Sequence, residues 1–192
     1  MIVVITLPTF IPNEADAIVR LFDERGIDRL HIRKPGMPEA DVASLIAQIP
    51  ERYYPLLSVH DHHALALQFG LGGIHLNGRC PEPPVGWQGL LSVSCHSLDE
   101  LAQRKQETFA VVDGLAGQGR PRFDYLSLSP IFDSISKQGY RSAFGRGQLR
   151  EAFASGIIDD RVLALGGVSF DRVEEVRAMG FGGAMILGDA WR

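Results

Sequence analysis

The stretch SVSCHSLDE, residues 92–100, places a titratable side chain where an apolar segment gives way to the start of a helix. A neutral imidazole, whose usual pKa is about 6.5, can take and return a proton at physiological pH, so His96 is the leading candidate for a catalytic group. Ser94 and Ser97 flank it and could orient the ring. The alternative is that His96 merely begins the helix. Cys95 is a weaker candidate for a nucleophile, because consecutive strand residues point to opposite faces.

Two apolar segments near the end of the chain stop in glycine, LALGGVS (163–169) and GAMILGDAW (183–191). Backbone N–H groups exposed at such a stop can hold a phosphate, helped by the positive end of a helix dipole. Gly166, Gly167 and Gly188 are therefore candidate phosphate-binding residues. The alternative is that these glycines only permit tight turns.

The loop SPIFDSISK (129–137) offers two hydroxyls and a positive charge to a phosphate or a carboxylate. The residues concerned are Ser134, Ser136 and Lys137. The same composition would also suit a solvated surface turn.

The segment LHIRKP (30–35) contains a charge in a strand that should be buried. Arg33 alternates with Leu30 and Ile32, so its guanidinium needs an anionic partner or an open site. A salt-bridged structural arginine is the alternative. Lys34 is expected to point to solvent.

The segment SVHDHHALA (58–66) contains His60, Asp61, His62 and His63 and resembles a metal cluster at first sight. Adjacent strand residues point to opposite faces, so these four side chains cannot converge easily, and no tightly bound transition metal is expected. Asp61 is a candidate cap for the next helix. His75 is expected to be a hydrogen-bonded histidine of the interior, whereas His31 is ambiguous and could face the helices.

Short apolar runs alternate with stretches of helical periodicity along all 192 residues. The expected strands are 1–7, 29–35, 55–61, 72–78, 90–96, 123–130, 161–167 and 182–188. The expected helices are 13–26, 38–50, 62–70, 147–156, 169–180 and one that begins at Ser97. Eight such steps predict one domain over 1–192 with the (β/α)8 fold of a TIM barrel, and a doubly wound open sheet is the alternative. Residues 107–121 are too many for a plain loop and are expected to extend a helix or form an extra turn.

Active sites in this fold lie at the C-terminal ends of the strands. Polar residues and glycines stand at these ends here: Arg33, His60, Asp61, Asn77, His96, Ser129, Gly167 and Gly188. Polar side chains that converge from different strands are what a small-molecule site needs. Arg33, His60 and Asn77 are therefore expected to contact the ligand.

Only DAWR (189–192) follows the eighth expected strand, so the last helix is expected to be short or missing. An apolar flank of the barrel would then stay uncovered, which predicts either association with a second copy or a chain that is a truncated form of a longer protein. The alternative is that residues 107–121 or the N-terminal helix cover the gap. Trp191 is the expected anchor of such a homo-oligomer.

The composition excludes several classes of partner. The net charge of −4 and the lack of any Lys/Arg run predict no nucleic-acid or membrane partner. No apolar run approaches the ~20 residues that cross a bilayer, and the opening MIVVITLPTF reads as a strand rather than a signal peptide. Cys80 and Cys95 are too few for a disulfide framework and match no zinc pattern. A cytoplasmic location is expected.

Seven fragments in this order resemble the thiamine phosphate synthase/TenI family of barrel proteins: LHIRKP, SVHDHHALA, GIHLNGR, SVSCHSLDE, DYLSLSPIFDSISK, LALGGVS and GGAMILG. The resemblance covers nearly the whole chain and implies a role in thiamine biosynthesis. Synthases of this family join a hydroxymethylpyrimidine diphosphate to a thiazole phosphate and release diphosphate, using Mg²⁺. TenI-type members aromatise a thiazole carboxylate phosphate by proton transfer without a metal.

The resemblance also assigns residues. It implies that the thiazole phosphate is held around Gly166, Gly167, Leu187 and Gly188, and that the loop with Ser134, Ser136 and Lys137 matches the diphosphate loop of the synthases. The catalytic histidine of the TenI type follows strand five in a Ser-x-His-Ser context, which His96 matches.

The sequence departs from the synthase pattern at three places. Synthases read Arg-acid-Lys after strand two, whereas this chain reads Arg33-Lys34-Pro35. The Asn-Asp pair after strand three appears as His60-Asp61, so Asp61 alone is left as a magnesium ligand. The second carboxylate falls at Cys80, and a thiol is a poor ligand for Mg²⁺. We therefore expect a TenI-like thiazole tautomerase without a cofactor. A Mg²⁺-dependent thiamine phosphate synthase is the alternative, and a non-catalytic barrel that binds thiazole or thiamine phosphate as a regulator is the third.

Overall fold

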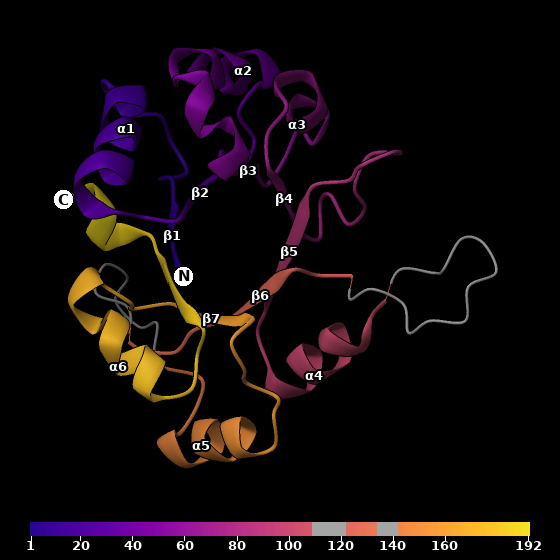
Figure 1. The fold of residues 1–192 in the computed structure, drawn as a ribbon, viewed down its shortest axis with the longest axis vertical. Helices are drawn as coiled ribbons and strands as arrows, with labels where there is room; N and C mark the ends of the chain where they lie inside the picture. Colours follow the sequence, from indigo (N-terminus) through magenta and orange to yellow (C-terminus); the bar gives the residue numbers. More distant parts are fainter. Residues whose placement is uncertain (109–121, 134–141) are drawn as a thin grey trace.

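The computed structural model describes residues 1–108, 122–133 and 142–192. Eight parallel strands close into a barrel in chain order, and the helices surround the ring of strands (Figure 1). Each strand pairs with its neighbour in the sequence, and β8 closes the ring on β1 through Val3 and Met185. The predicted TIM-type barrel is confirmed.

The strands are β1 (Ile2–Ile5), β2 (Arg29–Ile32), β3 (Leu57–Val59), β4 (Gly73–Leu76), β5 (Leu90–Cys95), β6 (Tyr125–Leu128), β7 (Val162–Leu165) and β8 (Gly183–Ile186). The α-helices are α1 (Glu14–Arg25), α2 (Glu39–Gln48), α3 (Ala64–Phe69), α4 (Leu98–Gln106), α5 (Arg146–Ala154) and α6 (Val173–Ala178). Three 3₁₀ turns complete the elements: η1 (Glu51–Leu56), η2 (Phe170–Arg172) and η3 (Gly188–Trp191). None of the described helices is long and apolar enough to span a bilayer.

Local signals in the sequence fix several helix ends. Ser97 caps α4 because its Oγ accepts the backbone N–H of Glu100 at 3.1 Å. Gly26 ends α1 in the left-handed conformation, with φ of 61°, which glycine adopts at little cost. α4 ends at Gln106, and most of the stretch 107–121, residues 109–121, lies outside the described residues.

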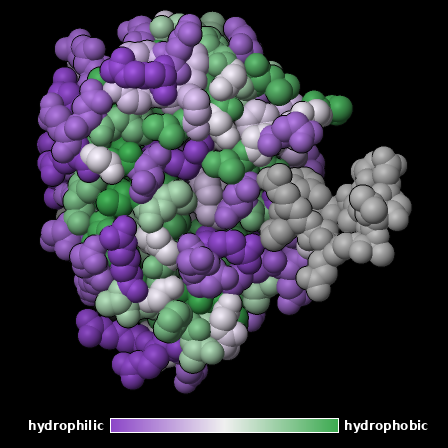
Figure 2. Space-filling model, viewed as in Figure 1, coloured by the Kyte–Doolittle hydropathy of each residue, from purple (hydrophilic) through white to green (hydrophobic). Residues whose placement is uncertain are grey.

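The residues after β8 form the short turn η3. Trp191 is half-buried, and its Nε1 donates to the carbonyl of Ile5 at 2.8 Å. The indole thus packs on its own barrel, and the homo-oligomer with Trp191 as its anchor remains a prediction. On the face seen in Figure 2, hydrophilic residues occupy most of the rim, with smaller hydrophobic patches between them.

The barrel interior is divided into an apolar half and a polar half. Val3, Ile5, Leu163 and Met185 form a separate apolar cluster with Tyr125 on strands β1, β6, β7 and β8. The buried side chains of the other half are polar: Arg29, His31, Ser58, His75, Ser92 and Ser127. Polar groups in a dry interior need hydrogen-bond partners, so this half must be organised by hydrogen bonds rather than by apolar packing.

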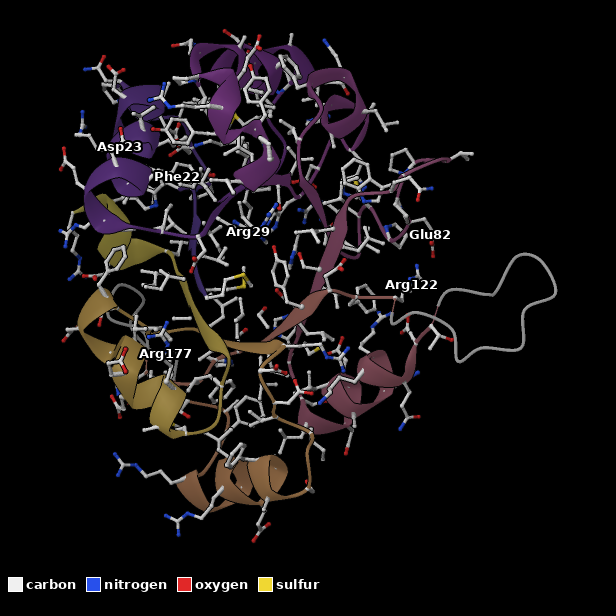
Figure 3. All side chains as sticks on the ribbon, viewed as in Figure 1. Phe22, Asp23, Arg29, Glu82, Arg122 and Arg177 are labelled. Carbon is white, nitrogen blue, oxygen red and sulfur yellow. The ribbon has the colours of Figure 1, made fainter. Side chains whose placement is uncertain are left out.

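Arg29 fills one end of the polar half and lies inside the ring of strands, whereas Asp23 and Arg177 lie on the outer helices (Figure 3). Its guanidinium donates to the carbonyls of Pro55 and Leu57 and to Ser58 Oγ. A Cβ at Gly73 would stand 2.3 Å from that Oγ and 3.0 Å from the guanidinium. Glycine at this strand position therefore makes the room that the buried arginine occupies.

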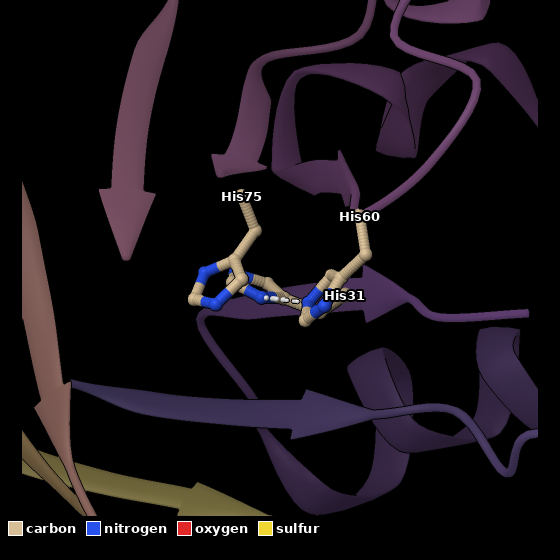
Figure 4. A group of neighbouring side chains, drawn as sticks. All are labelled: His31, His60 and His75. Atoms are coloured by element: carbon tan, nitrogen blue, oxygen red, sulfur yellow. Dashed lines mark hydrogen bonds between the residues drawn. The ribbon is translucent and has the colours of Figure 1, made fainter. Parts of the chain in front are cut away.

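His31 of β2, His60 just after β3 and His75 of β4 meet in the middle of the polar half (Figure 4). His31 Nδ1 lies 2.9 Å from His60 Nε2, and His31 Nε2 lies 2.5 Å from the Tyr125 hydroxyl. The His60 and His75 rings stack with centroids 4.1 Å apart. His75 hydrogen-bonds Ser92 Oγ at 2.8 Å and Ser94 Oγ at 3.1 Å. His75 is thus the interior histidine that was expected, and His31 faces the interior rather than the helices.

Burial keeps these three imidazoles neutral. Desolvation lowers the pKa of His31 and His60 well below the usual value, and neighbouring histidines lower it further. The pKa of His75 falls to about 3, mainly through burial. Each neutral ring therefore has one N–H donor and one acceptor nitrogen.

Lys34 does not point to solvent, and that expectation was wrong. Its Nζ forms an ion pair with Glu14 at 2.6 Å, and the two side chains are 1% and 2% exposed. It also donates to the carbonyls of Leu7 and Thr9. The buried ammonium thus connects the β1–α1 loop and the start of α1 to the end of β2.

The histidine trio predicts a loss of stability in mild acid. A histidine titrates near 6.5 in an unfolded chain, and burial lowers the pKa of His31, His60 and His75 in the fold, so the unfolded state binds more protons below pH 6.5. The free energy of unfolding should therefore fall as the pH drops from 6 to 5, by about 4 kcal/mol for the three histidines together. Urea unfolding at each pH measures this slope. His75→Gln should reduce it by about a third, and a flat profile from pH 7 to 5 would contradict the prediction.

The buried ion pair predicts a second stability effect. Lys34→Met leaves the Glu14 carboxylate buried and unpaired, which should lower the free energy of unfolding by about 3–5 kcal/mol. Lys34→Met combined with Glu14→Leu should recover most of this loss, because both charges are then removed. Arg177→Met is the matched control, since its pair with Glu174 is exposed and should contribute less than about 1 kcal/mol. Equal losses for Lys34→Met and Arg177→Met in urea unfolding would refute a structural role for the pair.

Candidate active site

A cleft of about 550 Å³ opens at the C-terminal ends of the strands. Five of the residues predicted from the sequence line it: Arg33, His60, Asn77, His96 and Leu187. It is also lined by His75, Arg79 and Ser94. A second cavity, of about 670 Å³, lies between α5 and α6 and contains none of the predicted site residues.

His96 directly follows β5 and is exposed. Its Nδ1 lies 3.3 Å from Ser129 Oγ at the end of β6, and its backbone N–H donates to Glu100 of α4 at 2.8 Å. Both contacts fix the orientation of the residue while the ring stays open to the cleft. The imidazole is therefore placed to exchange a proton with a bound ligand.

Arg33 brings a positive charge to the opposite side of the cleft, after β2. Its backbone N–H donates to Thr6 Oγ1 at 2.9 Å, and its carbonyl accepts from the same hydroxyl. The half-buried guanidinium forms no hydrogen bond or ion pair with any residue that the structure describes. An anionic ligand would supply that partner.

Asn77 holds the loop after β4 in place. Its amide nitrogen donates to the carbonyl of His60, and its Oδ1 accepts the backbone N–H groups of Arg79 and Cys80 at 2.9 and 3.2 Å. These contacts already use both ends of the amide, so within the described structure Asn77 positions the cleft wall.

The glycines after β7 are adjacent to the cleft but do not line it. Gly167 has φ of 66°, and a Cβ there would stand 2.4 Å from the carbonyl oxygen of Asp133, so the close approach of this loop requires glycine. The backbone N–H of Gly167 donates to no acceptor among the described residues. Asp189 Oδ2 accepts the backbone N–H of Phe170 at 3.0 Å and joins the loops after β7 and β8.

The other residues that the sequence predicts to bind phosphate lie in the loops after β6, β7 and β8. Gly166 precedes Gly167 with φ of 92°, and Gly188 begins η3 next to Leu187. The predicted diphosphate-loop residues Ser134, Ser136 and Lys137 lie outside the described residues.

The carboxylate expected to bind magnesium is already paired. Arg79 Nε and Nη2 donate to the two oxygens of Asp61 at 2.9 and 3.2 Å. Asp61 therefore pairs across to the next loop and does not cap α3, for which no side-chain cap forms. Cys80, where a second carboxylate would stand, is a half-buried free thiol. Among the described residues no group of three neighbouring ligands includes a carboxylate, so this donor set does not fit Mg²⁺.

The histidines of the SVHDHHALA segment diverge, as the sequence predicts. His62 contacts the carbonyl of Met37, and His63 contacts the carbonyl of Glu82. His31, His60 and His75 do gather, with ligand atoms within 4.8 Å of one another. Both nitrogens of His75 are engaged by serines, however, so the trio is a hydrogen-bonded network rather than three nitrogens aimed at one point.

Sequence reasoning placed Ser129 at the mouth of the barrel but missed Arg79 and Tyr125 as parts of the site. Alternation is the signal that could have found Tyr125. In Leu90–Cys95 and Tyr125–Leu128, with the residue or two that follow each strand, every second residue is polar: Ser92, Ser94 and His96, and Tyr125, Ser127 and Ser129. Alternate positions share one face of a strand, so these two series predict a polar barrel interior.

Comparisons with known proteins agree with this architecture. The family described as thiamine monophosphate synthase matches residues 2–188. The thiamine-phosphate synthase of Serratia proteamaculans is 30% identical over 91% of this chain and 79% of its own length. That of Latilactobacillus sakei is 27% identical over 77% of this chain and 62% of its own length.

Solved structures give the same result. A thiamine phosphate pyrophosphorylase from Bacteroides thetaiotaomicron is 39% identical, with 99% of this chain and 84% of that chain covered and a TM-score of 0.81. One from Pyrococcus furiosus shares the fold at 21% identity and a TM-score of 0.68. With a match over almost all its residues and a barrel of the same topology, the chain belongs to the thiamine monophosphate synthase family of thiamine biosynthesis.

Proposed function

We propose that this chain is a thiazole tautomerase of the TenI type, which aromatises a thiazole carboxylate phosphate by proton transfer. The observation that carries the proposal is the bidentate pairing of Asp61 with Arg79, beside Cys80. It removes the carboxylate on which a magnesium diphosphate site would depend. The proton-transfer residue His96, by contrast, is exposed at the cleft.

Two further contacts support this choice over the synthase reaction. Pro35 stands where a synthase lysine would meet the diphosphate, and the neighbouring Lys34 is buried against Glu14 and cannot replace it. Among the described basic residues that line the cleft, Arg33 is the one without an ion pair. Its guanidinium suits a carboxylate or phosphate, whereas a leaving diphosphate requires more charge compensation.

The proposed reaction is an isomerisation, so the proton taken from one carbon of the substrate is returned to another. In the tautomer in which His96 Nδ1–H donates to Ser129 Oγ, Nε2 is the basic nitrogen that takes the proton. The resulting imidazolium then acts as the acid. The loops after β7 and β8, with Gly166, Gly167, Leu187 and Gly188, hold the phosphate so that the thiazole lies beside His96.

A thiamine phosphate synthase is the second candidate. The names of the relatives from Serratia proteamaculans and Bacteroides thetaiotaomicron favour it. In that reaction Arg33 and Arg79 would contact the diphosphate, and Mg²⁺ would bind only after Asp61 had left Arg79. Either activity acts on a small thiazole phosphate.

Replacing His96 tests the proposed proton transfer. His96→Ala and His96→Asn should both lower kcat for aromatisation by roughly 10²–10⁴-fold with little change in ligand affinity. The reason is that neither side chain titrates near neutral pH. Single-turnover and steady-state assays of the thiazole carboxylate phosphate tautomer measure the effect.

Two variants serve as controls for this experiment. Ser129→Ala removes only an orienting hydrogen bond and should cost about 2- to 12-fold in kcat. His62→Asn lies away from the cleft at φ of 53°, a conformation that asparagine tolerates, and should keep full activity. Near-normal kcat in His96→Asn would rule out the proposed role.

The paired carboxylate predicts weak magnesium binding. Titration calorimetry of the wild type should show little Mg²⁺ affinity, and chelation should leave aromatisation unchanged. Cys80→Asp combined with Arg79→Ala frees Asp61 and adds a second carboxylate, so Mg²⁺ affinity should rise about tenfold or more. Strong Mg²⁺-dependent diphosphate release by the unmodified protein, without aromatisation, would contradict the tautomerase proposal and establish the synthase activity.

A further inference from the structure

The histidine network beneath the cleft contains an unbranched chain of hydrogen bonds. It runs from the Tyr125 hydroxyl on β6 to His31 Nε2 on β2, and from His31 Nδ1 to His60 Nε2 just after β3. Tyr125 is 5% exposed, His31 is fully buried and His60 is 5% exposed. Because both imidazoles are neutral, each link must have one donor and one acceptor.

Only one direction of this chain satisfies Tyr125. If His31 donated to the tyrosine oxygen, the hydroxyl proton would have no acceptor among the described residues, and an unpaired buried donor is strongly disfavoured. Tyr125 therefore donates to Nε2 of His31. Nδ1–H of His31 then donates to Nε2 of His60, which leaves the proton of His60 on Nδ1.

That Nδ1 reaches the cleft. Two fully buried side-chain polar atoms in the described structure lack a partner, Nε of Arg29 and Nε2 of His63. Nδ1 of His60 is not one of them, although no described residue bonds to it. It therefore belongs to the small part of His60 that the cleft exposes, where Arg33 is close enough to lower the pKa of His60.

We propose that Tyr125 and His31 lock His60 in the Nδ1–H form, and that this N–H and the Arg33 guanidinium together bind a carboxylate of the ligand. An imidazole fixed as a donor recognises an anionic oxygen and cannot act as the base. The tyrosine and His31 are positioning residues, and His60 and Arg33 are the binding residues. This inference rests on the proposed function for the identity of the carboxylate, that of the thiazole carboxylate phosphate.

The barrel separates this subsite from the expected phosphate site. β3 and β7 are four strands apart in a closed ring of eight, which places them on opposite sides of the mouth. Ile5, Leu165 and Leu187 supply apolar surface to the same cleft. A flat ring with an anionic group at each end matches this arrangement, because the phosphate is held after β7 and β8 and the carboxylate after β2 and β3.

Calorimetry with two stable ligands tests the carboxylate subsite. The probes are the aromatic thiazole carboxylate phosphate and the same thiazole phosphate without the carboxylate. The wild type should bind the carboxylated ligand about 10- to 100-fold more tightly, the gain expected from hydrogen bonds to a charged group. In Tyr125→Phe and in His60→Ala this preference should fall to a few-fold, while affinity for the decarboxylated ligand stays unchanged.

The matched control is Tyr54→Phe. Its hydroxyl donates to the carbonyl of Ile46 in the helix layer, so the preference should keep its wild-type value. Equal affinity of the wild type for both ligands would overturn the subsite. If Tyr125→Phe weakened both ligands and inorganic phosphate to the same extent, the anion bound there would be the phosphate, which also overturns it.

A spectroscopic measurement covers the case in which Tyr125→Phe fails to fold. The ¹⁵N spectrum of histidine-labelled wild-type protein reports the tautomer of each ring, and His60→Gln assigns the His60 signals. The hydrogen-bond chain from Tyr125 requires His60 to be protonated at Nδ1 in the protein without ligand. A proton on Nε2 of His60 would refute the proposal. Aromatisation is assayed separately, so a protein with the carboxylate preference but no turnover disproves the tautomerase and leaves the subsite standing.

Discussion

The need to satisfy every polar group inside the barrel is the constraint on which the rest of this structure depends. One half of the interior is apolar and packs as an ordinary core around Val3 and Met185. The other half contains three imidazoles, four serines and an arginine that cannot retain water around them. Burial keeps the imidazoles neutral, so each must be both donor and acceptor. That requirement fixes ring orientations and tautomers more tightly than apolar packing would.

The fold was predictable because its signals are local and repeated. Eight apolar runs, a capping serine at position 97 and a glycine stop at position 26 are each read within a few residues. The position of His96 at the mouth followed from the strand that precedes it. Every predicted strand occurs in the structure, although each is shorter than the apolar run that announced it.

The site was only partly predictable because its interactions join distant segments. Lys34 pairs with Glu14, twenty residues earlier, and Asp61 pairs with Arg79, eighteen residues later. Sequence periodicity reports which face of an element is buried and does not predict such ion pairs. The orientation of His31 could not be predicted because both faces of β2 are buried, so burial does not show which of its side chains point to the helices and which to the interior. Tyr125 and the alternating serines of β5 and β6 have a period of two, which indicates that they share one face of each strand. Only the closed barrel shows that both faces point to the same interior.

Family membership and residue chemistry answer different questions about this chain. The match over residues 2–188 establishes a barrel of thiamine biosynthesis, and barrels of one fold support different reactions through the residues at the strand ends. At those ends this chain has Asp61 paired with Arg79, a thiol at Cys80, and the imidazoles of His60 and His96. Carboxylate oxygens are suited to bind Mg²⁺, which would neutralise a leaving diphosphate. Neutral imidazoles are suited to donate hydrogen bonds to an anion and to transfer protons. His60 and His96 are both imidazoles at the rim, yet their surroundings separate their roles. The hydrogen bonds from Tyr125 through His31 fix His60 as a donor, whereas the ring of His96 contacts only Ser129 among the described residues and stays open to the cleft.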